Sequence, residues 1–114
     1  MHKIDFSSQA WETPASGARL KVHQEAGTRL RLLELASDFV EADWCVKGHI
    51  GYVLDGRLAV DFNGTVETFE PGDGLFIPPG EKHKHKARAL TATTTLILVE
   101  GFTEQGNAPD ASGQ

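Results

Sequence analysis

Gly72-Asp73-Gly74-Leu75-Phe76-Ile77-Pro78-Pro79-Gly80-Glu81-Lys82-His83-Lys84-His85 is the stretch that decides the fold of this chain. Its first three residues predict a turn, because glycine adopts backbone angles that other residues avoid. Leu75 to Ile77 form an apolar run that is long enough for a buried strand and too short for a helix. Pro78 and Pro79 end that strand, since proline cannot donate a hydrogen bond to a neighbouring strand.

Two histidines, His83 and His85, follow this corner with one residue between them. Side chains of a strand alternate between its two faces, so both imidazoles are expected to point the same way. Imidazole is a common metal ligand and a common general acid or base. The pair is therefore the first chemical lead in the sequence.

Short segments of alternating apolar and polar residues lie on both sides of this stretch. They cover residues 18–25, 28–36, 49–54, 58–62, 65–70 and 91–100. Asp55-Gly56 and Asn63-Gly64 separate three of them, and the second pair is typical of a two-residue hairpin turn. No segment of useful length has helical periodicity. The pattern predicts an all-β sandwich or barrel.

The segment 28–36 departs from simple alternation. Leu30 and Leu32 share one face, and the phase then slips at Leu33 and Leu35. Either a β-bulge or a strand buried on both faces would explain the slip.

Length and composition limit the class of protein. We expect a single domain over residues 1–103 of the 114-residue chain, and a disordered tail over 104–114. The net charge of -5 argues against a nucleic-acid surface. The sequence has no apolar run of the roughly 20 residues that span a membrane, and no signal peptide at its start. We therefore expect a soluble, cytoplasmic protein that binds neither nucleic acid nor membrane. Cys45 is the only cysteine, which excludes an intramolecular disulfide.

The sequence around this stretch resembles the cupin superfamily, whose fold is the double-stranded β-helix or jelly-roll barrel. The second motif of that family runs Gly, five residues, Pro, one residue, Gly, two residues, His, three residues, Asn. Gly72, Pro78, Gly80 and His83 stand at those spacings, and Ala87 stands where the family has Asn. The resemblance covers about residues 28–100.

The first motif of the family is altered in this chain. His49 takes the position of its Glu, ahead of Gly56, and Asp43 and Cys45 take the positions of its His-x-His pair. The resemblance thus implies a site formed by Asp43, Cys45, His49 and His83 around an interior point. Such a set suits zinc, iron or nickel, because thiolate and imidazole favour the softer divalent metals.

Other roles stay open for these residues. His85 could be a ligand, a partner of a ligand or the catalytic general base, with an ordinary pKa near 6.5. Cys45 could equally be a small buried hydrophobe, and Asp43 could cap a turn.

The resemblance implies an interior site for a small molecule and a homodimer packed through outer strands. Trp11 or Trp44 would suit such a contact. A metal-dependent oxygenase or isomerase is the first hypothesis for function. The alternatives are a metal-free module that binds or senses a small ligand, and a metal-free isomerase with His83 or His85 as its base.

Overall fold

The computed structural model describes residues 2–101, so the expected tail lies outside the described part of the chain. Within it there are nine strands, two single 3-10 turns and no α-helix. The strands are β1 (Glu12–Ala15), β2 (Ala18–Glu25), β3 (Thr28–Ala36), β4 (His49–Asp55), β5 (Leu58–Phe62), β6 (Thr65–Phe69), β7 (Gly74–Ile77), β8 (Lys86–Ala89) and β9 (Thr93–Gly101). The 3-10 turns are η1 (Phe6–Ser8) and η2 (Glu81–His83).

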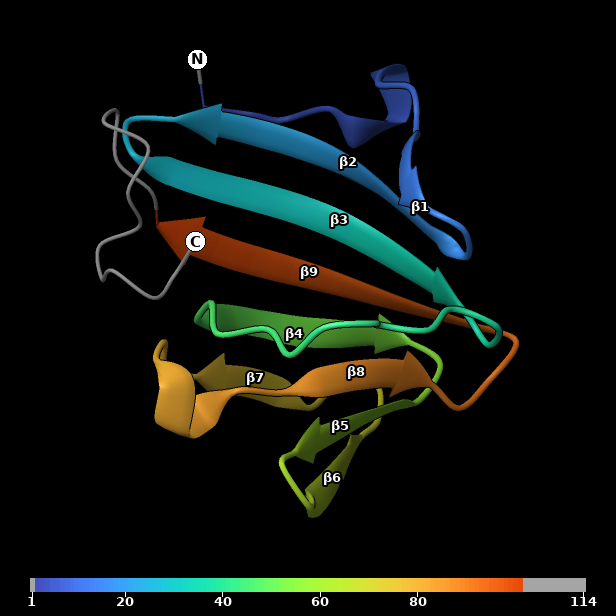
Figure 1. Cartoon of the computed structure of the whole chain (residues 1–114). Helices are drawn as coiled ribbons and strands as arrows, with labels where there is room; N and C mark the ends of the chain where they lie inside the picture. Colours follow the sequence, from blue (N-terminus) through green and yellow to red (C-terminus); the bar gives the residue numbers. More distant parts are fainter. Residues whose placement is uncertain (1, 102–114) are drawn as a thin grey trace.

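The strands form two antiparallel sheets. One has six strands in the order β1-β2-β3-β9-β4-β7, and the other has three in the order β6-β5-β8 (Figure 1). Neighbouring strands in the larger sheet come from distant parts of the sequence, as when β9 lies between β3 and β4. The fold is a jelly roll, which confirms the predicted all-β class.

The segment 28–36 is a single regular strand. Its pairings with β2 and β9 run from end to end without a register shift, so the bulge is wrong. Leu33 and Leu35 face the other sheet and line the cavity between the sheets, while Leu30 and Leu32 alternate with them along the same strand. The strand therefore has apolar side chains on both faces, which explains the slip in the alternation.

The stretch that decides the fold behaves as predicted in its first half and not in its second. Residues 74–77 form β7, which pairs with β4. Gly80 has φ 121, a conformation that favours glycine. Glu81 to His83 then form the turn η2 rather than a strand. The expectation that His83 and His85 share one strand face is therefore wrong.

The hydrophobic core lies between the two sheets. Val53 from β4, Leu58 and Val60 from β5, and Leu96 and Leu98 from β9 are all buried. Their side chains hold the sheets together through apolar burial. None of the helical turns in residues 2–101 is long and apolar enough to cross a membrane.

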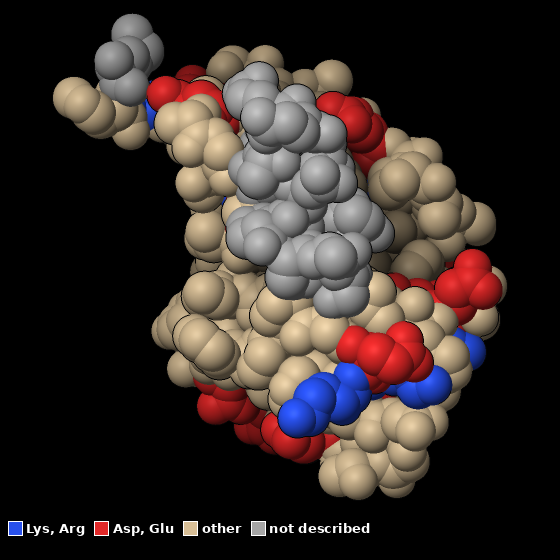
Figure 2. Space-filling model, turned by 60° about the vertical axis from the view of Figure 1, so that its left-hand side comes forward, with Lys and Arg blue, Asp and Glu red and all other residues tan. Residues whose placement is uncertain are grey.

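Charged residues are divided into small groups on the outside. On the part of the surface that Figure 2 draws in colour, Lys and Arg lie close to Asp and Glu. This mixture agrees with a chain that has 11 Lys and Arg against 16 Asp and Glu.

Candidate functional site

A cavity of about 350 Å³ lies between the two sheets. Most of its wall is aliphatic, from β2, β3, β5, β7 and β9. Its polar lining residues are Arg31, Glu41, Cys45, Lys47, His49 and His85. A mostly apolar cavity with a few polar groups is the usual form of a small-molecule site.

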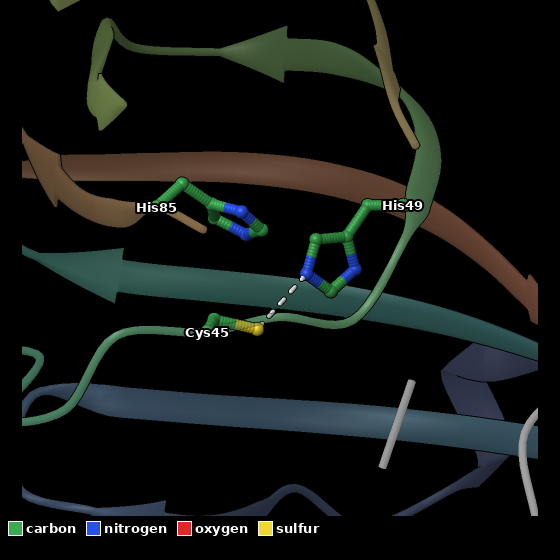
Figure 3. A group of neighbouring side chains, drawn as sticks. All are labelled: Cys45, His49 and His85. Carbon is green, nitrogen blue, oxygen red and sulfur yellow. Dashed lines mark hydrogen bonds between the residues drawn. The ribbon is translucent and has the colours of Figure 1, made fainter. Parts of the chain in front are cut away.

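Cys45, His49 and His85 come together at this cavity (Figure 3). One ligand atom from each residue lies within 4.8 Å of the others. His49 begins β4, whereas Cys45 and His85 are joined by backbone hydrogen bonds of 2.9 and 3.0 Å in an isolated β-bridge. That bridge fixes two of the three side chains relative to each other.

The His49 ring is oriented by a carboxylate. Its Nδ1 lies 2.6 Å from Oε2 of Glu100, whose same oxygen accepts a 2.7 Å hydrogen bond from Nη2 of Arg31. Burial raises the pKa of Glu100, but the His49 and Arg31 contacts outweigh it and lower that pKa to about 2. Glu100 is therefore ionised and accepts the Nδ1 proton, which leaves Nε2 of a neutral His49 as the nitrogen with a free lone pair.

The His85 ring is oriented by the backbone. Its Nδ1 lies 3.1 Å from the carbonyl oxygen of His83, which can only accept a hydrogen bond. Nδ1 must carry the proton, so the lone pair of the neutral ring is again on Nε2. The ring is almost fully buried, and it packs edge-on against His49 and beside Phe62.

The surroundings of His49 also shift its protonation. Burial lowers the pKa of the imidazole, while the hydrogen bonds with Cys45 and Glu100 raise it. The hydrogen bonds and the Glu100 charge prevail, and the pKa lies above its ordinary value of 6.5. A metal ion at this position would have to displace a proton from His49 over a wider pH range than from an ordinary histidine.

The donor set fits a zinc-like ion. Zinc bonds of about 2.3 Å to sulfur and about 2.0–2.1 Å to nitrogen at a tetrahedral angle place the two donors about 3.5 Å apart. Sγ of Cys45 and Nε2 of His49 are 3.6 Å apart. With His85 the site offers three protein ligands, the number typical of catalytic zinc, where a further position is open to substrate or water.

Two predicted ligands lie outside this group. Asp43 is exposed, and no group of three or more potential ligands within residues 2–101 includes either Asp43 or His83. His83 ends η2 and contributes its backbone carbonyl to His85. The structure thus brings Cys45 and His49 together with His85, and it places Asp43 and His83, the other two motif positions, outside the group.

The sequence pattern alone does not identify Glu100 and Arg31 as residues of the site. Arg31 lies on the same face of β3 as Leu33 and Leu35, and Glu100 lies on the same face of β9 as Leu96 and Leu98. A strand face that changes from charged to apolar along its length is a signal for the polar end of a cavity. The sequence does not show that the two charged ends meet.

Comparisons with known proteins agree with this fold. The family model of the cupin domain matches residues 46–99. No curated protein matches the sequence.

Several solved structures are similar. KdgF from Halomonas sp. is 20% identical with a TM-score of 0.72, and the match covers 87% of this chain and 93% of KdgF. An RmlC-like cupin from Shewanella frigidimarina is 16% identical with a TM-score of 0.71, over 92% of this chain and 94% of the other. EutQ from Clostridium difficile is 20% identical with a TM-score of 0.62, over 76% of this chain and 64% of EutQ.

At these identities the likeness concerns the fold and carries no activity across. The architecture, the matched family model and the solved structures agree with one another. Residues 46–99 match the cupin-domain family, and the described chain has the cupin fold.

Proposed function

We propose that this protein binds a divalent transition metal, namely zinc, iron or nickel, through Cys45, His49 and His85 and acts on a small molecule in the adjoining cavity. One observation carries the proposal. Both imidazoles have Nδ1 tied to an acceptor, and the remaining donor atoms gather with a cysteine sulfur within 4.8 Å. Orienting bonds of this kind are typical of metal-ligating histidines.

Different parts of the chain orient the proposed ligands and enclose the bound molecule. Glu100 holds the His49 ring, the His83 carbonyl holds the His85 ring, and the aliphatic walls exclude water from the bound molecule. A bound metal would supply Lewis-acid or oxygen-dependent chemistry, as in an isomerase or an oxygenase. The catalytic-base role predicted for His85 stays a prediction for the metal-free site, where Nε2 would take the proton instead of binding a metal.

Metal analysis of protein purified without a histidine tag tests the proposal. After stripping with a chelator and adding zinc, iron(II) or nickel, we expect about one equivalent of at least one metal to be retained. Cys45→Ser and His85→Ala should each weaken retention at least tenfold. His83→Ala is the matched control and should retain metal, because only the backbone of His83 contacts the site.

Less than about a tenth of an equivalent of every metal would reject the proposal. Metal retained equally by Cys45→Ser, His85→Ala and the wild type would reject the ligand set.

A metal-free module that binds or senses a small ligand is the second candidate. The separation of 3.6 Å between Cys45 and His49 also suits a thiol–imidazole hydrogen bond, and the cavity walls are mainly apolar. A ligand that binds equally well to stripped and metal-loaded protein would favour this function.

We also propose that the protein is a homodimer and that the outer face of the larger sheet forms the contact. Leu30, Val99, Ile50 and Phe76 lie in one cross-strand row over β3, β9, β4 and β7, and Ile97 and Tyr52 pair in a neighbouring row. Four of these side chains are exposed, Phe76 by 75%. A second copy of the same face would cover them on both protomers at once.

The tryptophans expected in that contact are less suitable. Arg19 and Lys21 lie over the Trp11 ring at 4.2 and 4.8 Å, and Lys84 and Lys86 lie over Trp44 at 5.5 and 4.8 Å. Cations already cover both rings.

A further inference from the structure

We infer that the cavity binds a small molecule that has an apolar body and a carboxylate, and that Arg31 recognises the carboxylate. This deepens the proposed function and rests on the cavity being the substrate site. It names a class of ligand and a specificity-determining residue.

Arg31 lies in the cavity wall with unused hydrogen-bonding capacity. Its Nη2 donates to Glu100, whereas its Nε is buried and has no hydrogen-bond partner within residues 2–101. A buried donor without a partner is costly, and such groups usually have an explanation in function. The Arg31 side chain as a whole is 20% accessible and lines the cavity, so a small shift of the guanidinium would let a ligand acceptor there satisfy this Nε.

The charges at this end of the cavity favour an anion. Glu100 faces two guanidinium groups, Arg31 at 2.7 Å and Arg29 at 3.8 Å, in addition to His49. Of these two arginines, Arg31 is the one that lines the cavity. Glu41 is the acidic side chain in the cavity wall, and its Oε1 already accepts a 2.8 Å hydrogen bond from the backbone of Ala87.

Lys47 adds to this charge. It lies in the cavity wall and forms no salt bridge with any residue from 2 to 101. A carboxylate on the ligand would give Lys47 an ion-pair partner and gain a charge-assisted hydrogen bond from Arg31.

The other end of the cavity is lined by aliphatic side chains, which favour an apolar group on the ligand. Along β3 the inward face passes from Arg31 to Leu33 and Leu35, and Leu58 and Val60 face them from β5. The ligand must fit a cavity of about 350 Å³ and contact both of its ends. A small carboxylic acid with a hydrocarbon or aromatic body does so.

Two acid–amide pairs test the inference: phenylacetate with phenylacetamide, and hexanoate with hexanamide. Each pair keeps the apolar body and removes the charge. Binding is followed by NMR titration of the backbone amides in chelator-treated protein and again after metal loading. We expect each acid to bind to the chelator-treated protein at least tenfold more tightly than its amide, because hydrogen bonds to charged groups contribute that much.

Arg31→Gln should abolish this preference, and Arg31→Lys should restore part of it. Arg19→Gln is the matched control, since Arg19 is also paired with a glutamate but does not line the cavity. Arg19→Gln should keep the full preference for the acids. Chemical shifts of residues remote from the cavity check that each variant is folded.

The outcomes separate this inference from the metal proposal. An acid preference that appears only after metal loading and survives in Arg31→Gln would assign the carboxylate to the metal and overturn the inference. An Arg31-dependent preference in protein that retains no metal would support the inference while the metal proposal fails. Equal binding of acids and amides, or binding of none of the four, would also overturn it.

Discussion

Glu100 contacts three positively charged or titratable side chains at the end of β9. Its carboxylate lies 2.6 Å from Nδ1 of His49, 2.7 Å from Nη2 of Arg31 and 3.8 Å from Nη1 of Arg29. A single carboxylate therefore orients a proposed metal ligand and holds the arginine assigned to substrate. Both proposed functions of the cavity therefore depend on this residue.

The depressed pKa of Glu100 gives a pH dependence of stability. The group titrates near 4.5 when unfolded and at about 2 when folded, so its contribution is present above pH 4.5 and is lost as the pH falls towards 2. The size is at most about 3 kcal/mol, and solvent screening reduces it. Denaturant unfolding of wild type and Glu100→Gln from pH 7 to 2 should show the two free energies converging at low pH. A constant difference would contradict the assigned role.

His49 gives a second pH dependence with the opposite sign. Its folded pKa is raised above 6.5, so its contribution to stability is complete below that pH and is lost as the pH rises through the folded pKa. In metal-free protein the free energy of unfolding should therefore decline above neutral pH, and His49→Gln should lack this decline. The same decline in both proteins would assign it to another group.

Strand β4 carries the site at one end and a tight contact in its middle. A Cβ on Gly51 would lie 2.4 Å from the carbonyl oxygen of Ile97 and 2.6 Å from the Leu98 side chain. The first neighbour is backbone of the adjacent strand β9, so it cannot move without separating the strands. The contact between His49 and Glu100 depends on this close pairing of β4 with β9.

Gly51→Ala should therefore destabilise the fold by roughly 2–4 kcal/mol and weaken metal retention. Gly74→Ala is the matched control on the paired strand β7, because its Cβ would meet its nearest neighbour at an ordinary 3.6 Å. Thermal unfolding of both variants measures the difference. Equal stability of the two would show that the strands adjust without cost.

At the scale of the whole molecule, the outer face of the six-stranded sheet carries a row of exposed apolar side chains. Replacement of Ile50 and Phe76 by serine should convert the proposed dimer to a monomer, since both are exposed and neighbours in register. Val66→Ser on the smaller sheet is the control, because Val66 is 57% exposed on a different strand. Sedimentation velocity measures the result. A monomeric wild type, or a dimer that survives the double substitution, would reject this face.

Much of the fold follows from local patterns in the sequence. The strand at 28–36 is recognised from its apolar residues, and the hairpin at Asn63-Gly64 from its turn residues, which both adopt positive φ. The spacing of Gly72, Pro78 and Gly80 identifies the corner after β7. These features depend on neighbours in the chain, so sequence reasoning can reach them.

The sequence by itself determined the all-β class and the family resemblance, and it singled out Cys45, His49 and His85 as candidate site residues. Only the tertiary structure decided that these three side chains lie together without His83, because a 3-10 turn at 81–83 breaks the strand alternation and a bridge to Cys45 positions His85. It also decided that Arg31 and Glu100, which are 69 residues apart, form an ion pair beside His49. Contacts between strands remote in sequence depend on sheet order and register, which local periodicity does not encode.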